Sequence, residues 1–253
     1  MLRVKQKQRQ KQSPNLAIKN NPTMQGVAVT PADAPCPTPE MDELFGQVEK
    51  YYSKKILTYG PTPLGVDWSC IPTQEMRFVQ LLKVCDFDGP ISINDIGCGY
   101  GALLAFLGKR HRRKTIDYMG LDISPAMVAH AQKRWKMRAN AAFEVASSGF
   151  RVADYAVASG TFNVKLNQPL ALWEQMIKTI LAEMYSTSQR GFAVNFLAPM
   201  PDGTPHIPEL YRAPPEMWCG YCQQTLGAQV EVVAGYGLRE YTLLVRKASS
   251  SAC

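Results

Sequence analysis

The sequence predicts an α/β domain with a mixed sheet of seven strands, helices on both faces and an antiparallel hairpin at its C-terminal end. Short runs rich in β-branched and aromatic residues alternate with longer helical stretches, a pattern typical of consecutive βαβ units. The last two runs are separated only by residues 235–240, too few for a helical crossover, so we expect them to form a hairpin. Apolar residues make up 46% of the 253-residue chain, enough to fill the core of a large domain.

The individual elements follow from hydrophobic periodicity. A helical pattern begins near Glu40, where Met41, Leu44, Phe45 and Val48 recur at three- and four-residue steps. The expected strands are residues 91–96, 116–121, 141–145, 155–159, 191–196, 230–234 and 241–245. Helices are expected between them near 72–85, 101–110, 125–138, 169–187 and 214–226. We therefore place the domain at residues 40–247, followed by a tail at 248–253.

The N-terminal segment, residues 1–39, differs in composition from the rest of the chain. Six cations and no acid fall within residues 1–32, and residues 13–39 contain six prolines. Without those cations the formal net charge falls from +7 to +1, so the body of the protein is nearly neutral. We expect this arm to be disordered and solvated rather than a contact for nucleic acid or an anionic membrane.

The cysteines and the distribution of apolar residues indicate a cytoplasmic protein. The chain has seven cysteines, an odd number, and is too large to need disulfides for stability, so we expect reduced thiols. No run approaches 18 consecutive apolar residues, and no apolar segment with a cleavage site follows the basic N-terminus. These features predict neither a membrane span nor a secretory signal.

A glycine-rich turn after the first expected strand is the most informative motif. The strand at 91–96 runs into Gly97, Gly99 and Gly101, and a helix begins directly afterwards. Glycines at such a turn let the backbone approach a ligand closely, and the helix N-terminus offers free N–H groups. Asp122 ends the second strand, where a carboxylate can accept both hydroxyls of a ribose. Ser124 then fits the N-cap of the next helix.

Two cofactor classes fit this turn. Gly97, Gly99 and Ala102 also satisfy the dinucleotide fingerprint, so an enzyme using a nicotinamide must be considered. Asp95 argues against it, because a carboxylate two residues before the first glycine would repel a pyrophosphate. The same carboxylate suits the cationic amino group of S-adenosylmethionine. The C-terminal hairpin favours the second cofactor as well.

These features together resemble the class I S-adenosylmethionine-dependent methyltransferases, which have a Rossmann-like fold. The resemblance rests on the Asp95–Gly101 turn, the Gly-Leu-Asp-Ile-Ser-Pro segment ending at Pro125, and the closing strand pair, and it spans about residues 45–247. It implies that Gly97, Cys98 and Gly99 contact the methionine end and that Asp122 binds the ribose. It further implies that the cofactor also contacts the following residues: Ile123, Met127, Ser159, Gly160 and Thr161.

The chain departs from that family at the adenine end. Many members carry an acid after the third strand, whereas this chain has Ser147 and Ser148 there. Either serine, or a backbone carbonyl, could take its place. The segment after the fourth strand lacks the Asn-Pro-Pro-Tyr motif of enzymes that methylate amino groups of nucleic acid or glutamine, which argues against those substrates.

Residues 40–85 resemble the N-terminal helical lid of small-molecule methyltransferases. Tyr52 and Trp68 are candidates to contact the sulfonium, because aromatic faces attract cations. Packing of both rings in the core is the alternative. Arg77 is a candidate partner for the cofactor's carboxylate, and a solvated helix face is its alternative.

The expected substrate loop is residues 197–215, at the edge of the sheet where specificity usually resides. His206 is a candidate general base, although many methyltransferases need none because they act by positioning the reactants. Tyr211, Arg212 and Asn163 are candidate substrate contacts.

Three further patterns favour structural interpretations. Cys219 and Cys222 have metal-like spacing but no second ligand pair, and Cys98 is expected to pack in the turn. The basic run 109–114 ends a helix, where cations complement the helix dipole. We expect no metal.

The sequence thus predicts a cytoplasmic enzyme, a monomer or homodimer, that transfers a methyl group from S-adenosylmethionine to an oxygen or nitrogen of a small molecule, leaving S-adenosylhomocysteine. Neither nucleic acid nor membrane is expected as a partner. The alternatives are an RNA-modifying methyltransferase, which would use the arm and the run 109–114 as phosphate contacts, and a non-catalytic module that binds the cofactor. A nicotinamide enzyme is a more distant alternative.

Overall fold

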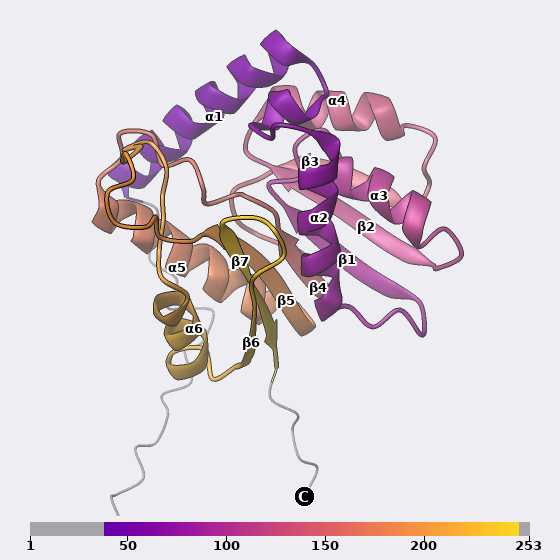
Figure 1. Ribbon diagram of the computed structural model, residues 1–253. Helices are drawn as coiled ribbons and strands as arrows, with labels where there is room; N and C mark the ends of the chain where they lie inside the picture. The colour runs from indigo at the N-terminus through magenta and orange to yellow at the C-terminus, as the bar shows by residue number, and fades with distance from the viewer. Residues whose placement is uncertain (1–37, 248–253) are drawn as a thin grey trace, which may run out of the picture. The chain divides into compact units, whose positions relative to one another are not determined.

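The computed structural model describes residues 38–247, so the expected arm, apart from its last two residues, and the expected tail lie outside the described part of the chain. A seven-stranded sheet forms its centre, in the order β3-β2-β1-β4-β5-β7-β6 (Figure 1). Its strands are β1 (Ile91–Ile96), β2 (Ile116–Asp122), β3 (Ala141–Val145), β4 (Ala153–Ala158), β5 (Ser188–Leu197), β6 (Gln229–Val233) and β7 (Glu240–Arg246).

The strand directions confirm the predicted mixed sheet. β1 to β5 are mutually parallel, and β7 runs antiparallel to both β5 and β6. The predicted hairpin is therefore present, with its second strand inserted beside β5. This places the start of β7 next to the end of β5, where Leu197 pairs with Glu240.

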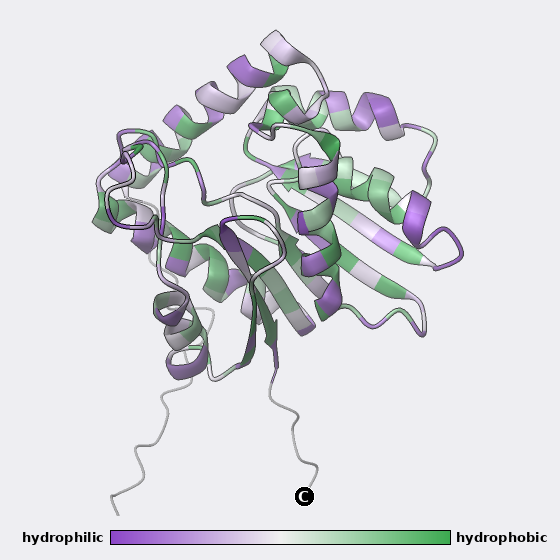
Figure 2. Ribbon diagram, viewed as in Figure 1, coloured by the Kyte–Doolittle hydropathy of each residue, from purple (hydrophilic) through white to green (hydrophobic). Residues whose placement is uncertain are grey.

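Helices cover both faces of the sheet, as predicted. The helical elements are α1 (Pro39–Tyr59), η2 (Pro63–Val66), α2 (Ile71–Leu81), η3 (Leu82–Val84), α3 (Ala102–Arg110), α4 (Pro125–Trp135), α5 (Leu170–Thr187) and α6 (Pro215–Gln224). α2, α3 and α4 share one apolar cluster with side chains such as Ile93 and Tyr118, and α5 and α6 share another with Ile96 and Phe196. Figure 2 shows the strands coloured mainly as apolar, as expected for a sheet buried on both sides.

Helix α1 lies across the carboxyl edge of the sheet, from α5 toward α4 (Figure 1). It begins at Thr38, whose side chain accepts a hydrogen bond from the Met41 N–H, and ends at Gly60, whose φ is 65°. Its first half buries Leu44 in the apolar cluster of α5. Its second half reaches α4, where the hydroxyls of Ser53 and Ser124 are 2.7 Å apart.

The crossover between β3 and β4 has no helix. Parallel strands are usually joined through one, but residues 146–152 make this connection alone. Phe150 of this segment is buried in the same cluster as Leu44 and Val48 of α1. The Phe150 N–H also donates to Glu183 near the end of α5 at 2.8 Å, so this segment packs against α5 within the cluster to which α1 contributes.

Within residues 38–247, no helix is both long and apolar enough to cross a bilayer. Five cysteines lie in the same range, and all five are free. Cys219 and Cys222 lie in helix α6, where Cys222 is buried.

Candidate active site

The glycine turn joins β1 to α3 at the carboxyl edge of the sheet. Gly97, Gly99 and Gly101 all have positive φ, and Gly101 is the N-cap of α3. A Cβ on Gly97 would lie 2.7 Å from the Thr161 hydroxyl oxygen, so only glycine fits there. The Thr161 hydroxyl in turn donates to the Ile96 carbonyl at 2.9 Å. The turns after β1 and β4 are thus held against each other.

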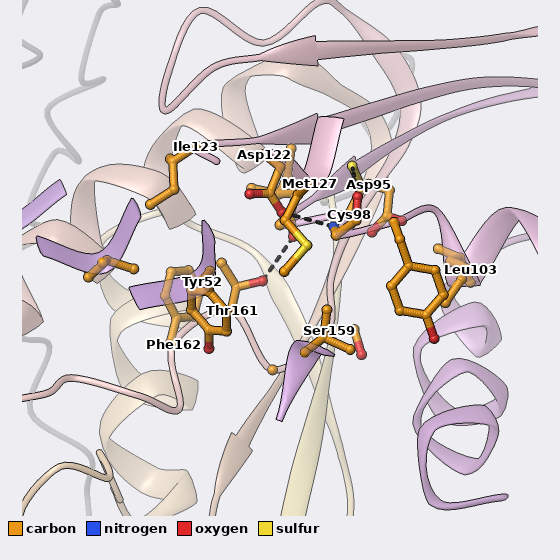
Figure 3. A pocket seen from close by; sticks show the side chains of 18 of the residues that line it. Tyr52, Asp95, Cys98, Leu103, Asp122, Ile123, Met127, Ser159, Thr161 and Phe162 are labelled. Carbon is orange, nitrogen blue, oxygen red and sulfur yellow. Dashed lines mark hydrogen bonds between the residues drawn. The ribbon is translucent and has the colours of Figure 1, made fainter. Parts of the chain in front are cut away.

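A pocket with about 1000 Å³ of empty space, part of it open to solvent, lies at this edge beneath α1. Thirteen of the predicted cofactor residues line it: Tyr52, Trp68, Asp95, Gly97, Cys98, Gly99, Asp122, Ile123, Met127, Ser147, Ser159, Gly160 and Thr161. Figure 3 shows Asp95, Cys98 and Asp122 on one side of the pocket and Tyr52, Thr161 and Phe162 on the other. The fold therefore brings together residues that are up to 109 positions apart in the sequence.

Asp122 lies at the tip of β2 and is 8% exposed. One carboxylate oxygen accepts the Gly99 N–H at 2.8 Å, and the other accepts the Ser124 N–H at 2.9 Å. Burial raises its pKa to about 6, although both hydrogen bonds act in the opposite direction. A carboxylate oxygen can accept more than one hydrogen bond, so each retains capacity for a hydroxyl of a ligand.

Asp95 is the second carboxylate of the pocket and is 3% exposed. The Tyr118 hydroxyl donates a hydrogen bond to its Oδ2 atom. Burial raises the Asp95 pKa to about 7, and the nearby charge of Asp122 adds to this rise. The pocket thus holds two buried acids whose ionised forms a cationic ligand would stabilise.

Trp68 closes the pocket on the side of β4. Gly160, at the end of β4, has a φ of 71°, and a Cβ there would collide with Cζ2 of the indole. The residue before the indole, Asp67, accepts the Tyr51 hydroxyl at 2.7 Å and pairs with Lys55 at 2.5 Å. Helix α1 therefore fixes the segment that carries Trp68.

Arg77 departs from the sequence prediction. Its Nε donates to Glu240 at 2.9 Å, its second guanidinium nitrogen pairs with the same carboxylate at 2.5 Å, and its third donates to the Thr73 carbonyl at 2.8 Å. The guanidinium also stacks on Trp68, 3.7 Å from the ring centroid. All three nitrogens are thus engaged by the protein and Arg77 does not line the pocket, so the predicted contact with the cofactor's carboxylate is not seen.

The predicted acceptor contacts lie outside the pocket lining. Tyr211 is 2% exposed and its hydroxyl donates to Glu174 at 3.2 Å, while Arg212 donates to the Ala198 carbonyl at 2.9 Å. His206, the candidate base, is exposed on the segment between β5 and α6, and Ser148 is exposed after β3. Neither Tyr211 nor Arg212 is therefore directed at the cofactor site.

Asn163 occupies a different position from the other acceptor candidates. It is 4% exposed, and neither amide atom has a hydrogen-bond partner among residues 38–247. Its Nδ2 would lie 3.4 Å from a Cβ on Gly160, so it sits directly behind the turn after β4. The Ser159 hydroxyl, which lines the pocket, is buried and likewise has no partner in this range. Two such polar groups thus flank Gly160, where a ligand could satisfy them.

Several lining residues had no signal in the sequence that separated them from ordinary core residues. They come from α1, α2 and α5: Phe45, Val48, Gln74, Phe78, Trp173, Met176 and Ile180. Helical periodicity predicts that such residues are buried, but it cannot show that they face a cavity rather than another side chain.

The charge of the lining restricts its chemistry. Of the described residues that line the pocket, only Asp95 and Asp122 carry charged side chains, and none is a lysine, arginine or histidine. Between Thr38 and Lys247, no three or more His, Cys, Asp or Glu side chains gather as a metal site would require. The pocket therefore suits a ligand that carries positive charge and hydroxyls.

S-adenosylmethionine meets these requirements. The close backbone turn at Gly97 leaves room for the methionine chain, the Asp122 oxygens can accept ribose hydroxyls, and Ile123 and Met127 offer apolar contact for a base. The positive charges of the ammonium and the sulfonium would balance the buried acids.

Comparison with known proteins agrees with this geometry. The family model described as "Methyltransferase domain" matches residues 93–191. The protein named "Putative methyltransferase Rv1506c", from Mycobacterium tuberculosis, is 42% identical over 168 residues, which are 66% of this chain and 100% of that protein.

Solved structures share the fold at low sequence identity. Human N-acetylserotonin methyltransferase in complex with SAM superposes with a TM-score of 0.57 at 15% identity, covering 82% of this chain and 60% of the human chain. An Aquifex aeolicus SAM-dependent methyltransferase gives a TM-score of 0.51 at 18% identity, covering 70% and 94% of the two chains. Together with the glycine turn, the acid at the tip of β2 and the closing hairpin, these matches place the chain in one family. It belongs to the class I S-adenosylmethionine-dependent methyltransferases.

Proposed function

We propose that this methyltransferase acts on a small molecule and alkylates one of its oxygen or nitrogen atoms. The observation that carries this proposal is the enclosure of the pocket: α1 lies over it, and Trp68 narrows it against Gly160. An acceptor must pass these elements to reach the donor. A single metabolite can do so more readily than a folded nucleic acid or protein surface.

When bound, the cofactor supplies a methyl group on a sulfonium, which is already a good electrophile. The residues of the chain then bind, orient and exclude water. Asp122 would accept the ribose hydroxyls, Asp95 would face the ammonium, and Tyr52 and Trp68 would present aromatic faces to positive charge. An acceptor held in line would displace the methyl group from sulfur, leaving a neutral thioether, and its own proton would pass to water. Positioning supplies most of the rate enhancement in such a displacement.

The position of His206 supports catalysis without a histidine base. No histidine is among the described residues that line the pocket, and His206 lies on an exposed segment. Ser159 is better placed to contact an acceptor, because it lines the pocket and its hydroxyl has no partner among residues 38–247. Asn163 lies behind the turn after β4 and could reach an acceptor only if that turn moved.

The basic run supports a small-molecule acceptor over RNA. Residues 109–114 follow α3, which begins at the glycine turn and runs away from it. This hydrophilic segment leads into Ile116, which pairs with Ile91 at the amino end of β1 (Figure 2). The cations therefore lie at the opposite edge of the sheet from the pocket, where they would not present RNA to the donor.

The test is a labelling experiment with three acceptor pools. The protein is incubated with methyl-labelled S-adenosylmethionine and, separately, the low-molecular-mass fraction of a cell extract, total RNA, or the protein fraction. We expect label in the low-molecular-mass products, and transfer to RNA or protein would overturn the proposal. An Asp122→Ala variant, whose cofactor site is damaged, controls for background.

We propose that the N-terminal arm takes no part in cofactor binding. Every described residue that lines the pocket lies between Phe45 and Ile180, so a chain starting at residue 36 should bind the cofactor as the full chain does. A large loss of affinity on truncation would contradict a purely solvated arm.

We propose a cytoplasmic location, supported by the unpaired cysteines of residues 38–247.

A further inference from the structure

Asp95 and Tyr118 form a buried pair beneath the glycine turn. Tyr118 is completely buried and Asp95 nearly so, and the tyrosine hydroxyl donates to one carboxylate oxygen. Asp95 belongs to the glycine motif, but Tyr118 lies in the middle of β2, where an apolar residue would serve the core equally well. Its hydroxyl therefore calls for an explanation other than packing.

The sheet register fixes the geometry of this pair. β1 and β2 are parallel, Asp95 lies opposite Gly120, and Tyr118 lies two residues earlier on the same face. Gly120 has no side chain, and a Cβ there would lie 2.5 Å from the Phe143 ring and 2.9 Å from the Cys98 sulfur, which fill the space beside the pair. The Tyr118 ring packs against Phe143 with centroids 5.6 Å apart. The hydroxyl is thus held in place, and it orients a carboxylate that lines the pocket.

The charges around Asp95 oppose its ionisation. Burial is the largest cause of the rise of its pKa to about 7, Asp122 adds to it, and the Tyr118 hydrogen bond counteracts it. The Cys98 thiol stays neutral, because burial raises its pKa well above the ordinary value. From α2, Gln74 is uncharged and Arg77 is neutralised by Glu240. Among residues 38–247 no cation therefore lies close enough to balance an ionised Asp95, so a cationic ligand would favour that form.

We propose that Tyr118 is a positioning residue for cofactor binding: its hydroxyl holds the Asp95 carboxylate toward the ammonium of the cofactor and so couples binding to the release of one proton. The proton leaves the Asp95 carboxyl for the solvent, while the ammonium remains charged. This inference rests on the contact between Asp95 and the ammonium in the proposed function.

The experiment is calorimetric titration of the full chain with two probes between about pH 5.5 and about pH 8.5. S-adenosylhomocysteine carries the ammonium, and 5′-methylthioadenosine has the same nucleoside without the amino-acid end. The wild type is compared with Tyr118→Phe, which keeps the ring, and with Asp95→Asn. Repeating one titration near pH 6.5 in buffers of different ionisation enthalpy counts the protons released.

For the wild type we expect affinity for S-adenosylhomocysteine to rise up to about tenfold per pH unit and to level off near pH 7. In Tyr118→Phe the midpoint should move up by about one pH unit, so the loss of affinity is about tenfold below about pH 6, about fivefold at about pH 7, and disappears in alkali. Asp95→Asn should bind weakly without this dependence. Affinity for 5′-methylthioadenosine should not depend on pH in this way in any of the three proteins.

Three results would overturn the inference. One is a Tyr118→Phe protein with the wild-type midpoint. Another is a loss that is equal at every pH and for both probes, which would indicate a packing role alone. The third needs only the wild type: no proton release with S-adenosylhomocysteine near pH 6.5. Failure of both probes to bind at any pH would instead contradict the cofactor assignment itself.

Discussion

Asn195 holds the turn at Gly160: its side-chain oxygen accepts the Gly160 N–H at 2.7 Å. Its amide nitrogen donates to Glu240 at 2.5 Å, and Glu240 binds Arg77. Asn195 is completely buried, and Glu240 and Arg77 are 3% and 6% exposed. A buried polar chain therefore runs from α2 through β7 and β5 to the wall of the pocket. The position of the turn after β4 depends on strands far from it in sequence.

Breaking this chain should be costly. Glu240→Gln leaves the Arg77 charge buried without its partner, and we expect a loss of about 3–5 kcal/mol in the free energy of unfolding. Urea denaturation would measure it. The matched control is Glu231→Gln on the neighbouring strand β6, whose pair with Arg246 is exposed and should contribute at most about 1 kcal/mol. Equal losses in the two variants would contradict the importance of the buried pair.

Asp122 should dominate binding at the ribose end. Asp122→Ala should weaken S-adenosylhomocysteine binding by about 1.5–3 kcal/mol, because hydrogen bonds to a charged group are lost. Calorimetric titration would give the change. Asp117→Ala, on the same strand but exposed and paired with Arg151, serves as control and should bind normally. Unchanged affinity in a folded Asp122→Ala protein would remove the ribose assignment.

Gly160 should tolerate no side chain. In Gly160→Ala the new Cβ would meet the Trp68 indole, and the positive φ adds about 1–2 kcal/mol of strain. We expect loss of thermal stability and of cofactor affinity together. Gly149→Ala is the control for backbone strain without a collision. Gly149 has a φ of 75°, but a Cβ there would meet no atom within 4 Å.

The steric part of this prediction can be tested by rescue. Adding Trp68→Ala to Gly160→Ala should restore part of the stability, because the collision is removed while the strain remains. A double variant no better than Gly160→Ala would show that the indole is not what the new side chain meets. Unfolding temperatures of the four proteins in the cycle provide the measurement.

Stability should depend on pH through Asp95. Its folded pKa, about 7, lies above the ordinary value of 3.8, so the folded protein holds a proton that the unfolded chain releases. Between about pH 4 and about pH 7 this group makes the free energy of unfolding fall as pH rises. In Asp95→Asn the Asp95 part of this fall should be lost, leaving the smaller fall that Asp122 causes through its own pKa of about 6.

The change in the free energy of unfolding with pH should be compared between the wild type and Asp95→Asn, since exposed carboxylates titrate equally in both proteins. Urea denaturation at about pH 5 and about pH 7.5 is sufficient. If the wild type lost no more stability than Asp95→Asn over this interval, the carboxyl would not be protonated in the folded state at neutral pH.

Much of the fold could be predicted because its signals are local. The seven strands lie within a few residues of their predicted positions, since each is a short apolar run bounded by turn residues or by a helix of clear period. The glycine turn and Asp122 could be placed together because carboxyl ends of parallel strands share one edge of the sheet. Thirteen of the predicted cofactor residues line one pocket for this reason.

The predictions that relied on residue type alone did not locate the partners of the side chains. Arg77 has the fork of donors that suits a carboxylate, and it does bind one, but that carboxylate is Glu240, 163 positions away. Tyr211 looked like a residue of an open loop, yet it packs beside Trp218 with ring centroids 6.4 Å apart. Residue type shows what a side chain can bind, whereas its partner depends on which distant element lies beside it.

Local patterns in the chain were sufficient to establish the alternation of strands and helices, the turn at Gly97 and the acid at Asp122, and with them the cofactor. These features depend on periodicity and on backbone requirements within a few residues. The insertion of β7 between β5 and β6, which brings Glu240 to Asn195, and the placement of α1 over the edge of the sheet became known from the folded domain alone. Such contacts are chosen by the packing free energy of the whole domain, which no local pattern encodes.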